Sequence, residues 1–351
     1  MQHSDYKNIH WNYSIREQLL GRGLDRLPHA MLLVGPAGVG KAAFSEQLAA
    51  LLLCESIQSD LTACGKCPAC HWLESGNHPD FRRVAPDGDD AVEEGASEKA
   101  AEKAKKRSQK IIRIDQIREL EAFVFVGSHR QGNRVVLVTE ADAMNPAAAN
   151  ALLKILEEPP VNVYFILVST RSKSLLPTIR SRCRVIPFGP PDRAAAVNWL
   201  AGAGLEKHAA RYLDLAGGAP MRVAEWKDEG QLAPIDALVD TLLAPPADPL
   251  ALAARWDALL KGDGMFRMEN LVEGVQRWLF DLAQERMAGE VRYHGGWARP
   301  KTVKNLDPLA LLAAWREINQ FRRSARHPLN QLLFLENLAT HTLRALRPGT
   351  A

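Results

Sequence analysis

The chain has 351 residues, 46% of them hydrophobic and 24% charged, with a formal net charge of +3. This length suits two or three domains, and the basic excess is too small by itself to indicate direct binding of nucleic acid. No apolar run approaches the roughly 20 residues of a membrane span and the N-terminus has no apolar signal region, so we expect a cytoplasmic protein without a membrane partner.

The first 30 residues indicate a short helix and a turn that lead into an apolar strand. Their aromatic side chains include Trp11, Tyr13 and His29. A base pocket and the packing of an amphipathic helix both account for these residues, and packing is the simpler explanation.

Residues 35–42, with the sequence GPAGVGKA, have the form of a phosphate-binding loop. They follow the strand-like run 31–34 and precede a helical pattern at 43–53. Glycines let successive backbone N–H groups face one anion, the helix adds the positive end of its dipole, and the lysine reaches the outer phosphates. The candidate nucleotide-binding residues of this loop are Gly35, Gly38, Gly40, Lys41 and Ala42.

The last of these residues departs from the motif. Ala42 stands where a Ser or Thr would hold Mg²⁺, and its side chain has no oxygen to offer. We therefore expect a loop able to hold ATP or ADP without hydrolysing it, and we do not expect bound Mg²⁺. A glycine-rich turn that packs without any ligand is the alternative interpretation.

Four of the five cysteines are crowded together with the spacing C-x9-C-x2-C-x2-C: Cys54, Cys64, Cys67 and Cys70. Four thiolates at this spacing suit a closed tetrahedral Zn²⁺ site with a structural role. His71 and His78 are close enough in sequence to replace Cys54 as the fourth ligand, but we favour Cys54. A redox pair and unpaired thiols are the alternatives.

Residues 86–110 change in composition, because an acidic block is followed by a basic block with almost nothing apolar. Such a segment cannot contribute to a core, so we interpret it as a solvated insertion.

The run 135–138 is predicted to be a strand buried on both faces, and it ends in Thr139-Glu140-Ala141-Asp142. In a P-loop ATPase an acidic pair at this strand end would hold Mg²⁺ and polarise the attacking water. Here Thr139 replaces the first acid and only Glu140 keeps its place. Asp142 is better explained as a cap of the next helix. Positions 42 and 139 are thus both degraded as metal-holding positions.

A helix over 146–158 and another buried strand over 163–168 follow. Strands that alternate with helices predict a parallel sheet covered on both faces. Thr170 stands at the carboxyl end of the second strand, where such sheets place ligand contacts, and is a further candidate nucleotide residue.

Three arginines, Arg180, Arg182 and Arg184, alternate in the segment 177–184. Taken alone, they are typical of solvated surface charge.

Prolines in 187–191 mark a domain boundary, and beyond it only helical patterns occur. We predict an α/β domain over 1–188 that contains the cysteine module (54–70) and the charged insertion (86–110), a small helical domain over 189–229, and an all-α domain over 230–351. Arg222 in the small domain is a candidate phosphate contact, although plain exposure fits it as well.

With these motifs placed, the chain resembles the delta prime subunits of bacterial DNA polymerase III clamp loaders, within the AAA+ superfamily. The matching stretches are GPAGVGKA (35–42), the cysteine module (54–70), ANALLKILEEPP (149–160), Ser181-Arg182-Cys183 and HPLNQLLFLENL (327–338). The resemblance implies an AAA+ P-loop domain with an inserted zinc module, then a helical lid and an all-α C-terminal collar that joins subunits. The charged insertion has no counterpart expected in the family core.

The resemblance also implies a role. A motor subunit of the gamma/tau type would carry Thr or Ser at 42 and Asp at 139, so we expect a non-hydrolysing stator of the DNA-directed DNA polymerase III holoenzyme, a nucleotidyltransferase complex. Its expected partners are gamma/tau and delta, and, through the assembled ring, the sliding clamp and primed DNA. Arg182 is expected to be an arginine finger that acts in trans on a neighbouring motor subunit.

Two other functions compete with this interpretation. The retained Lys41 and glycines are consistent with an ATP-hydrolysing motor subunit. The cysteine module is consistent with a zinc-dependent nucleic-acid-binding protein, whose affinity would depend strongly on salt.

Overall fold

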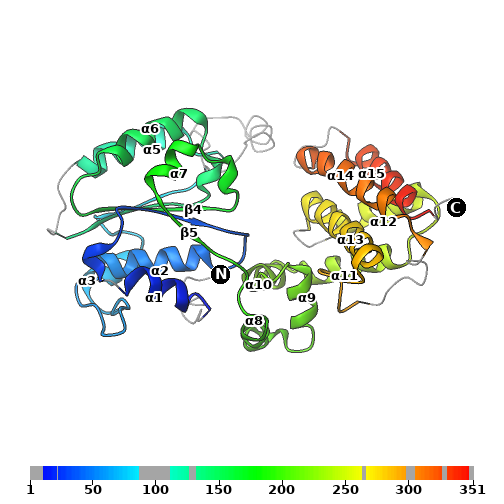
Figure 1. Ribbon diagram of the computed structural model, residues 1–351, viewed down its shortest axis with the longest axis horizontal. Coiled ribbons are helices and arrows are strands. Elements are labelled where there is room, and N and C mark those ends of the chain that lie inside the picture. The colour runs from blue at the N-terminus through cyan, green and yellow to red at the C-terminus, as the bar shows by residue number, and fades with distance from the viewer. Residues whose placement is uncertain are drawn as a thin grey trace. The chain divides into compact units, whose positions relative to one another are not determined.

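The computed structural model describes residues 11–21, 23–86, 111–125, 132–262, 266–297, 305–325 and 330–347. The chain forms two compact units, residues 1–191 and 192–351 (Figure 1). Their boundary lies close to the one predicted after residue 188, whereas the predicted boundary after residue 229 stays a prediction. The charged insertion 86–110 lies outside the described residues apart from Pro86.

The first unit is built on a five-stranded parallel sheet, which confirms the predicted α/β architecture. Its order across the sheet is β2-β3-β4-β1-β5. The strands are β1 (Ala30–Val34), β2 (Phe81–Val84), β3 (Arg134–Val138), β4 (Val163–Ser169) and β5 (Arg184–Pro187).

Helices cover both faces of this sheet. Figure 1 shows α1, α2 and α3 on one face and α5, α6 and α7 on the other. Their bounds are α1 (Tyr13–Leu20), α2 (Lys41–Leu53), α3 (Pro68–Glu74), α5 (Ile114–Phe125), α6 (Pro146–Glu157) and α7 (Pro177–Arg182). Its described residues also include three short 3-10 turns: η2 (Leu24–Arg26), η3 (Ala141–Ala143) and η4 (Ser172–Ser174).

The inner strands β1, β3 and β4 form the core of the unit. Leu32, Val136 and Phe165 have no exposed surface, because helices pack on both sides of them. The edge strands differ, since β2 carries the exposed Arg82 and Arg83 and β5 carries the exposed Arg184. Charged side chains on the edges protect a sheet against pairing with another chain.

The register of the parallel strands brings three chain segments to one edge of the sheet. Val34 is paired with Ser169 across β1 and β4, and Val138 is paired with Leu167 across β3 and β4. The loop after β1, the turn after β3 and the residues after β4 therefore leave from the same carboxyl edge. This edge is where parallel sheets bind ligands.

The second unit is helical throughout its described residues, as the sequence predicts for this part of the chain. Its helices are α8 (Arg193–Leu200), α9 (Ala209–Leu215), α10 (Pro220–Asp228), α11 (Leu232–Leu243), α12 (Pro249–Leu260), α13 (Met268–Ala288), α14 (Pro308–Ser324) and α15 (Gln331–Ala345), with a short π-helical turn η5 (Ala201–Leu205) after α8.

Polar caps define where several of these helices begin. The side chains of Asp192, Asp248, Asp307 and Asn330 each accept a hydrogen bond from a backbone N–H of the first helical turn. Such caps satisfy donors that the helix itself cannot pair. The bundle core behind them includes the fully buried Trp256.

Gly35, the first residue of the predicted phosphate-binding loop, lies against the chain that leaves β5. The N–H of Phe188 donates to Val34 O at 2.7 Å, which draws Phe188 close to the end of β1. A Cβ at Gly35 would lie only 2.0 Å from the carbonyl oxygen of Phe188. Glycine is required here because any side chain would collide with backbone.

Replacing Gly35 by alanine should therefore destabilise the first unit. Either the loop or the segment after β5 must move, and overpacking of this kind costs about 1–3 kcal/mol. Urea unfolding followed by circular dichroism should show a free energy of unfolding lower by about that amount. Gly132→Ala is the matched control, since nothing lies within 4 Å of its added methyl group. Equal stability of the two variants would contradict the constraint.

Candidate functional site

The loop 35–42 connects β1 to α2 in the manner expected of a phosphate-binding loop. Gly38 (φ 77°) and Gly40 (φ 99°) both adopt backbone conformations that other residues rarely take. Gly40 directly precedes α2, which runs for 13 residues from Lys41. The first N–H groups of α2 and the positive end of its dipole therefore face the loop.

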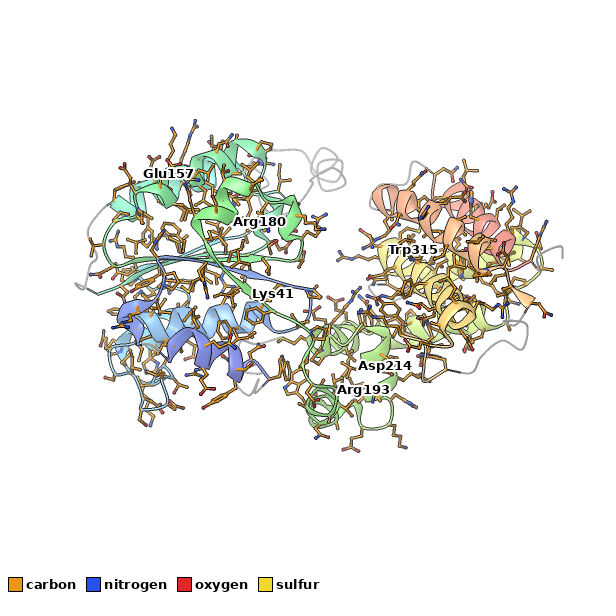
Figure 2. The ribbon with its side chains drawn as sticks, viewed as in Figure 1. Lys41, Glu157, Arg180, Arg193, Asp214 and Trp315 are labelled. Carbon is orange, nitrogen blue, oxygen red and sulfur yellow. The ribbon has the colours of Figure 1, made fainter. Side chains whose placement is uncertain are left out.

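Lys41 is tied to the loop itself. Its Nζ donates hydrogen bonds to Gly35 O at 2.8 Å and to Pro36 O at 2.5 Å, and the residue is only 4% exposed. Figure 2 marks it at the start of α2. Burial lowers the pKa of Lys41 to about 8, and the negative charge of Asp142 offsets part of this shift. The ammonium group stays largely protonated at neutral pH, as phosphate binding requires.

Trp11 makes a contact with this loop that the sequence did not reveal. Its indole Nε1 donates to Val39 O at 3.1 Å. The ring thus braces the loop from the chain segment before α1, which agrees with a packing role for Trp11. Trp11 and Val39 are 28 residues apart in the sequence and meet only in the folded chain, so no local sequence pattern could have indicated this hydrogen bond.

The turn after β3 offers no carboxylate at the first metal position. Thr139 donates its hydroxyl to Val84 O at 3.2 Å, and its N–H bonds to the same oxygen. The next residue, Glu140, is exposed and adopts a left-handed conformation with φ 50°. Ala42, at the second metal position, is exposed and has no oxygen in its side chain. Their roles toward nucleotide stay predictions.

Asp142 does not cap the next helix, so that interpretation is wrong. Asn145 fills the cap, because its side chain accepts from the N–H of Ala148 at 2.7 Å. Asp142 instead accepts from the N–H of Thr170 at 3.0 Å and from Nε of Arg171 at 3.1 Å. Burial opposes its ionisation, but these hydrogen bonds outweigh the penalty and lower its pKa. Asp142 thereby joins the ends of β3 and β4, and it holds Thr170 at the carboxyl edge.

Arg182 is the last residue of α7 and belongs to the same unit as the loop. Its guanidinium donates to Glu157 Oε1 at 2.5 Å and to Thr178 O at 3.1 Å. Cys183, which follows, is buried in the core, and burial raises the pKa of its thiol to about 11. The buried thiol anchors the backbone behind Arg182, while Arg180 and Arg184 on either side are exposed.

Arg222 lies in α10 of the second unit, where it has a partner within that unit. It forms a two-pronged ion pair with Glu273 of α13, and its guanidinium lies 5.2 Å from the ring centre of Trp226. Glu273 also pairs with Arg277 at 2.7 Å. A contact of Arg222 with nucleotide therefore stays a prediction, and any such contact would compete with Glu273.

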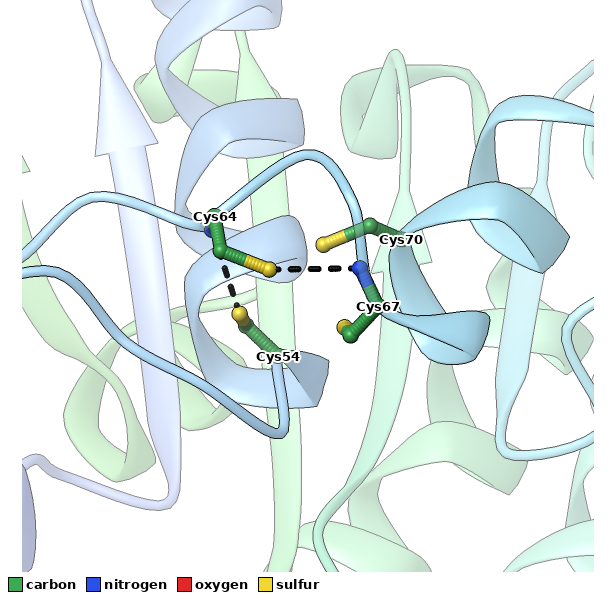
Figure 3. Close-up of side chains that lie close together, drawn as sticks. All are labelled: Cys54, Cys64, Cys67 and Cys70. Atoms are coloured by element: carbon green, nitrogen blue, oxygen red, sulfur yellow. Dashed lines mark hydrogen bonds between the residues drawn. The ribbon is translucent and has the colours of Figure 1, made fainter.

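The four predicted metal ligands gather in one cluster in the first unit, contributed by the end of α2, a turn and the start of α3 (Figure 3). The sulfur atoms of Cys54, Cys64, Cys67 and Cys70 all lie within 4.8 Å of one another. This donor set could hold one tetrahedral zinc ion. Among the described residues, the cluster contains neither His71 nor His78, which supports Cys54 as the fourth ligand.

Backbone hydrogen bonds stabilise thiolate at one corner of the cluster. The N–H groups of Lys66 and Cys67 point at Sγ of Cys64, at 3.4 Å and 3.3 Å, and lower the pKa of Cys64 to about 6. Burial has the opposite effect on Cys70 and raises its pKa to about 12. N–H groups directed at sulfur are common around metal-bound thiolates, because they disperse the accumulated negative charge.

These features define the first unit as an α/β domain with a parallel sheet, a P-loop-like turn and a four-cysteine module. Residues 21–192 match the family model described as DNA polymerase III, delta subunit. Over 255 residues the chain is 37% identical to the DNA polymerase III subunit delta' of Pseudomonas aeruginosa, with 71% of each chain covered. The chain therefore belongs to the family of DNA polymerase III delta' subunits.

Two further similarities lie outside that family. The DNA polymerase III subunit gamma/tau of Mycobacterium bovis is 31% identical over 265 residues, covering 68% of this chain and 42% of that protein. A solved DNA polymerase III gamma subunit-related protein from Thermotoga maritima covers 96% of this chain and is itself covered completely, at 16% identity and a TM-score of 0.45. The fold assignment does not depend on the latter.

Among the described helices, none is both long and apolar enough to cross a membrane.

Proposed function

We propose that the chain is the non-hydrolysing stator subunit of a DNA polymerase III clamp loader. It assembles with gamma/tau and delta subunits into a ring that loads the sliding clamp on primed DNA. Family membership supports the complex, since the P. aeruginosa relative is a subunit delta' of DNA polymerase III. The similarity to a gamma/tau subunit supports partners of related architecture.

One observation favours the stator over a motor: the two positions that would anchor Mg²⁺ supply no suitable oxygen. Ala42 has none, and at position 139 a neutral hydroxyl, which donates its hydrogen to Val84 O, replaces the carboxylate that a P-loop ATPase carries there. Mg²⁺ requires near-octahedral oxygen coordination and usually takes one or two protein ligands beside the phosphates. Without that ion, charge that develops on the transferred phosphoryl group is not neutralised, so hydrolysis is disfavoured even where the loop holds nucleotide.

An ATP-hydrolysing motor of the gamma/tau type is the second candidate. It is favoured by the intact loop glycines and by Lys41, which keeps a largely protonated ammonium at the loop. The two candidates agree on nucleotide binding and differ on turnover. Turnover therefore separates them.

We also propose that Arg182 acts in trans. It stands at the exposed end of α7, on a backbone fixed by the buried Cys183, with part of its guanidinium accessible. A guanidinium brought beside a neighbour's nucleotide stabilises the negative charge of phosphoryl transfer. The chain would thus contribute to hydrolysis at a site that is not its own.

For the cysteine cluster we propose a structural Zn²⁺ bound by Cys54, Cys64, Cys67 and Cys70. Four sulfur ligands leave no open coordination position, so the ion would staple the segment between α2 and α3 rather than catalyse a reaction. The convergence of four sulfurs from separate elements supports this proposal. A zinc-dependent nucleic-acid-binding module is the competing function, and salt-dependent binding of DNA by the isolated chain, lost in Cys67→Ala, would support it.

The purified chain should not hydrolyse ATP. Assayed alone with Mg²⁺ and primed DNA, its phosphate release should match that of Lys41→Ala, because neither protein can anchor the metal ion and activate water. Nucleotide binding, measured separately by equilibrium dialysis, should be weaker in Lys41→Ala because the loop loses its ammonium group. Brisk turnover by the wild-type chain that Lys41→Ala abolishes would establish the motor function instead.

Arg182→Ala should leave assembly of the ring intact and lower ATP turnover at the neighbouring motor site. An arginine finger contributes about 10³–10⁵ to the rate, so the share of that one site in total turnover should be lost. Gel filtration of the reconstituted complex measures assembly, and its steady-state rate of ATP hydrolysis measures turnover. Exposed Arg184→Ala serves as the control. Unchanged hydrolysis after Arg182→Ala would refute the action in trans.

The purified chain should contain about one zinc ion, and Cys67→Ala should contain none. Zinc displaces protons from thiols whose pKa is raised, as at Cys70, so its affinity should increase with pH. Below about pH 6 protonation of Cys64 in the metal-free cluster adds to this competition, so sufficient acidification should release the metal. Metal content by atomic absorption after dialysis at several pH values tests this. Cys183→Ala is the matched control, since that thiol lies outside the cluster.

A further inference from the structure

Arg182, for which we propose a role in trans, is itself held by an acidic side chain. Its Nη2 donates to Oε1 of Glu157 at 2.5 Å, and its Nη1 donates to Thr178 O at 3.1 Å. Glu157 is the last residue of α6, so the two partners come from different helices (Glu157 is labelled in Figure 2). The side chains are 34% exposed for Arg182 and 49% for Glu157.

Both side chains extend from rigid backbone. On α6, Leu152 and Leu156 are buried in the core of the first unit. On and after α7, Ile179 and Cys183 are buried in the same core cluster. The helix ends are therefore fixed relative to each other, and the ion pair is set by the fold although it lies at the surface.

The contact leaves Arg182 able to bind a further anion. Arginine has five N–H donors, and the bonds to Glu157 and Thr178 use two of them. Glu157 engages through a single oxygen, in contrast to the two-pronged pair of Arg222 with Glu273. One part of the guanidinium is restrained, and other donors of the fork stay available for phosphate oxygens.

We propose that Glu157 is a positioning residue for Arg182, which orients the guanidinium for the nucleotide of the neighbouring subunit. This inference rests on the proposed action of Arg182 in trans. A free arginine side chain samples many rotamers, and each productive encounter would have to restrict them. A partner that restricts them beforehand removes that cost from the reaction, and a misplacement of about 1 Å lowers a rate by about 10²-fold.

If the role of Glu157 were purely structural, its loss would lower the unfolding temperature of the chain. The proposed positioning role predicts otherwise. Exposed ion pairs contribute little to stability, so loss of Glu157 should hardly change the unfolding of the chain. Its effect should be seen instead in the rate at the neighbour's site. The rate and the unfolding temperature thus separate positioning from a structural role.

The experiment uses a reconstituted ring in which only the motor site next to Arg182 is active. Glu157→Ala should lower kcat for ATP at that site by about ten- to a hundredfold, with KM nearly unchanged, because the motor subunit still binds its own nucleotide. Glu157→Gln keeps an acceptor oxygen without the charge, so its kcat should lie between those of the wild-type chain and Glu157→Ala. Glu158→Ala, which alters the next acidic residue, is the matched control and should behave as wild type.

The double variant Glu157→Ala/Arg182→Ala should be no slower than Arg182→Ala alone, because Glu157 acts only through that arginine. If Arg182→Ala leaves turnover unchanged, the action in trans is wrong. If Arg182→Ala slows turnover while Glu157→Ala does not, the action in trans stands and positioning by Glu157 is overturned. A double variant slower than Arg182→Ala also overturns it, as does a large fall in the unfolding temperature of Glu157→Ala that accounts for its loss of rate.

Discussion

The parallel pairing of β1 with β4 is the constraint on which the first unit depends. It sets Val34 beside Ser169, so the glycine loop, the turn after β3 and Thr170 emerge together at one edge. The pairing of β1 with β5 then brings Phe188 against Gly35 and limits the loop to a residue without a side chain. Asp142 completes the edge by joining the ends of β3 and β4 through Thr170 and Arg171. The loop is thus held in shape from several sides, although it lacks the oxygens of a metal site.

That combination separates two tasks that a P-loop usually performs together. Holding phosphate needs backbone N–H groups, a helix N-terminus and a cation, all of which this chain retains. Cleaving phosphate needs an anchored metal ion and a polarised water as well, and these depend on side chains at positions 42 and 139. In the proposed stator, Ala42 and Thr139 would remove the second task without disturbing the loop backbone that the first requires. Under the proposed function, a subunit built in this way would keep the loop architecture and contribute Arg182 to the chemistry of a neighbouring subunit.

Much of this arrangement could be predicted from the sequence, for physical reasons that particular elements show. The inner strands were predictable because burial on both faces demands continuous apolar runs, and the cysteine cluster because its spacing is local. The edge strands β2 and β5 were missed, because each is only four residues long and has exposed positions, among them two arginines in β2 and one in β5. The bonds of Trp11 to Val39 and of Asp142 to Thr170 join segments distant in sequence, and only the sheet register brings them together.

The ion pairs of Glu273 have a mechanical consequence for the second unit. Both carboxylate oxygens of Glu273 on α13 accept from Arg222 of α10, and Glu273 also pairs with Arg277 on its own helix. These side chains are largely buried, so solvent screens the attraction between their charges poorly. Helix α10 is therefore fastened to the long helix α13 across the boundary predicted after residue 229. Under the proposed function, a rotation of α13 within the assembled ring would carry α10 with it, so the predicted boundary after residue 229 would transmit motion as a rigid connection.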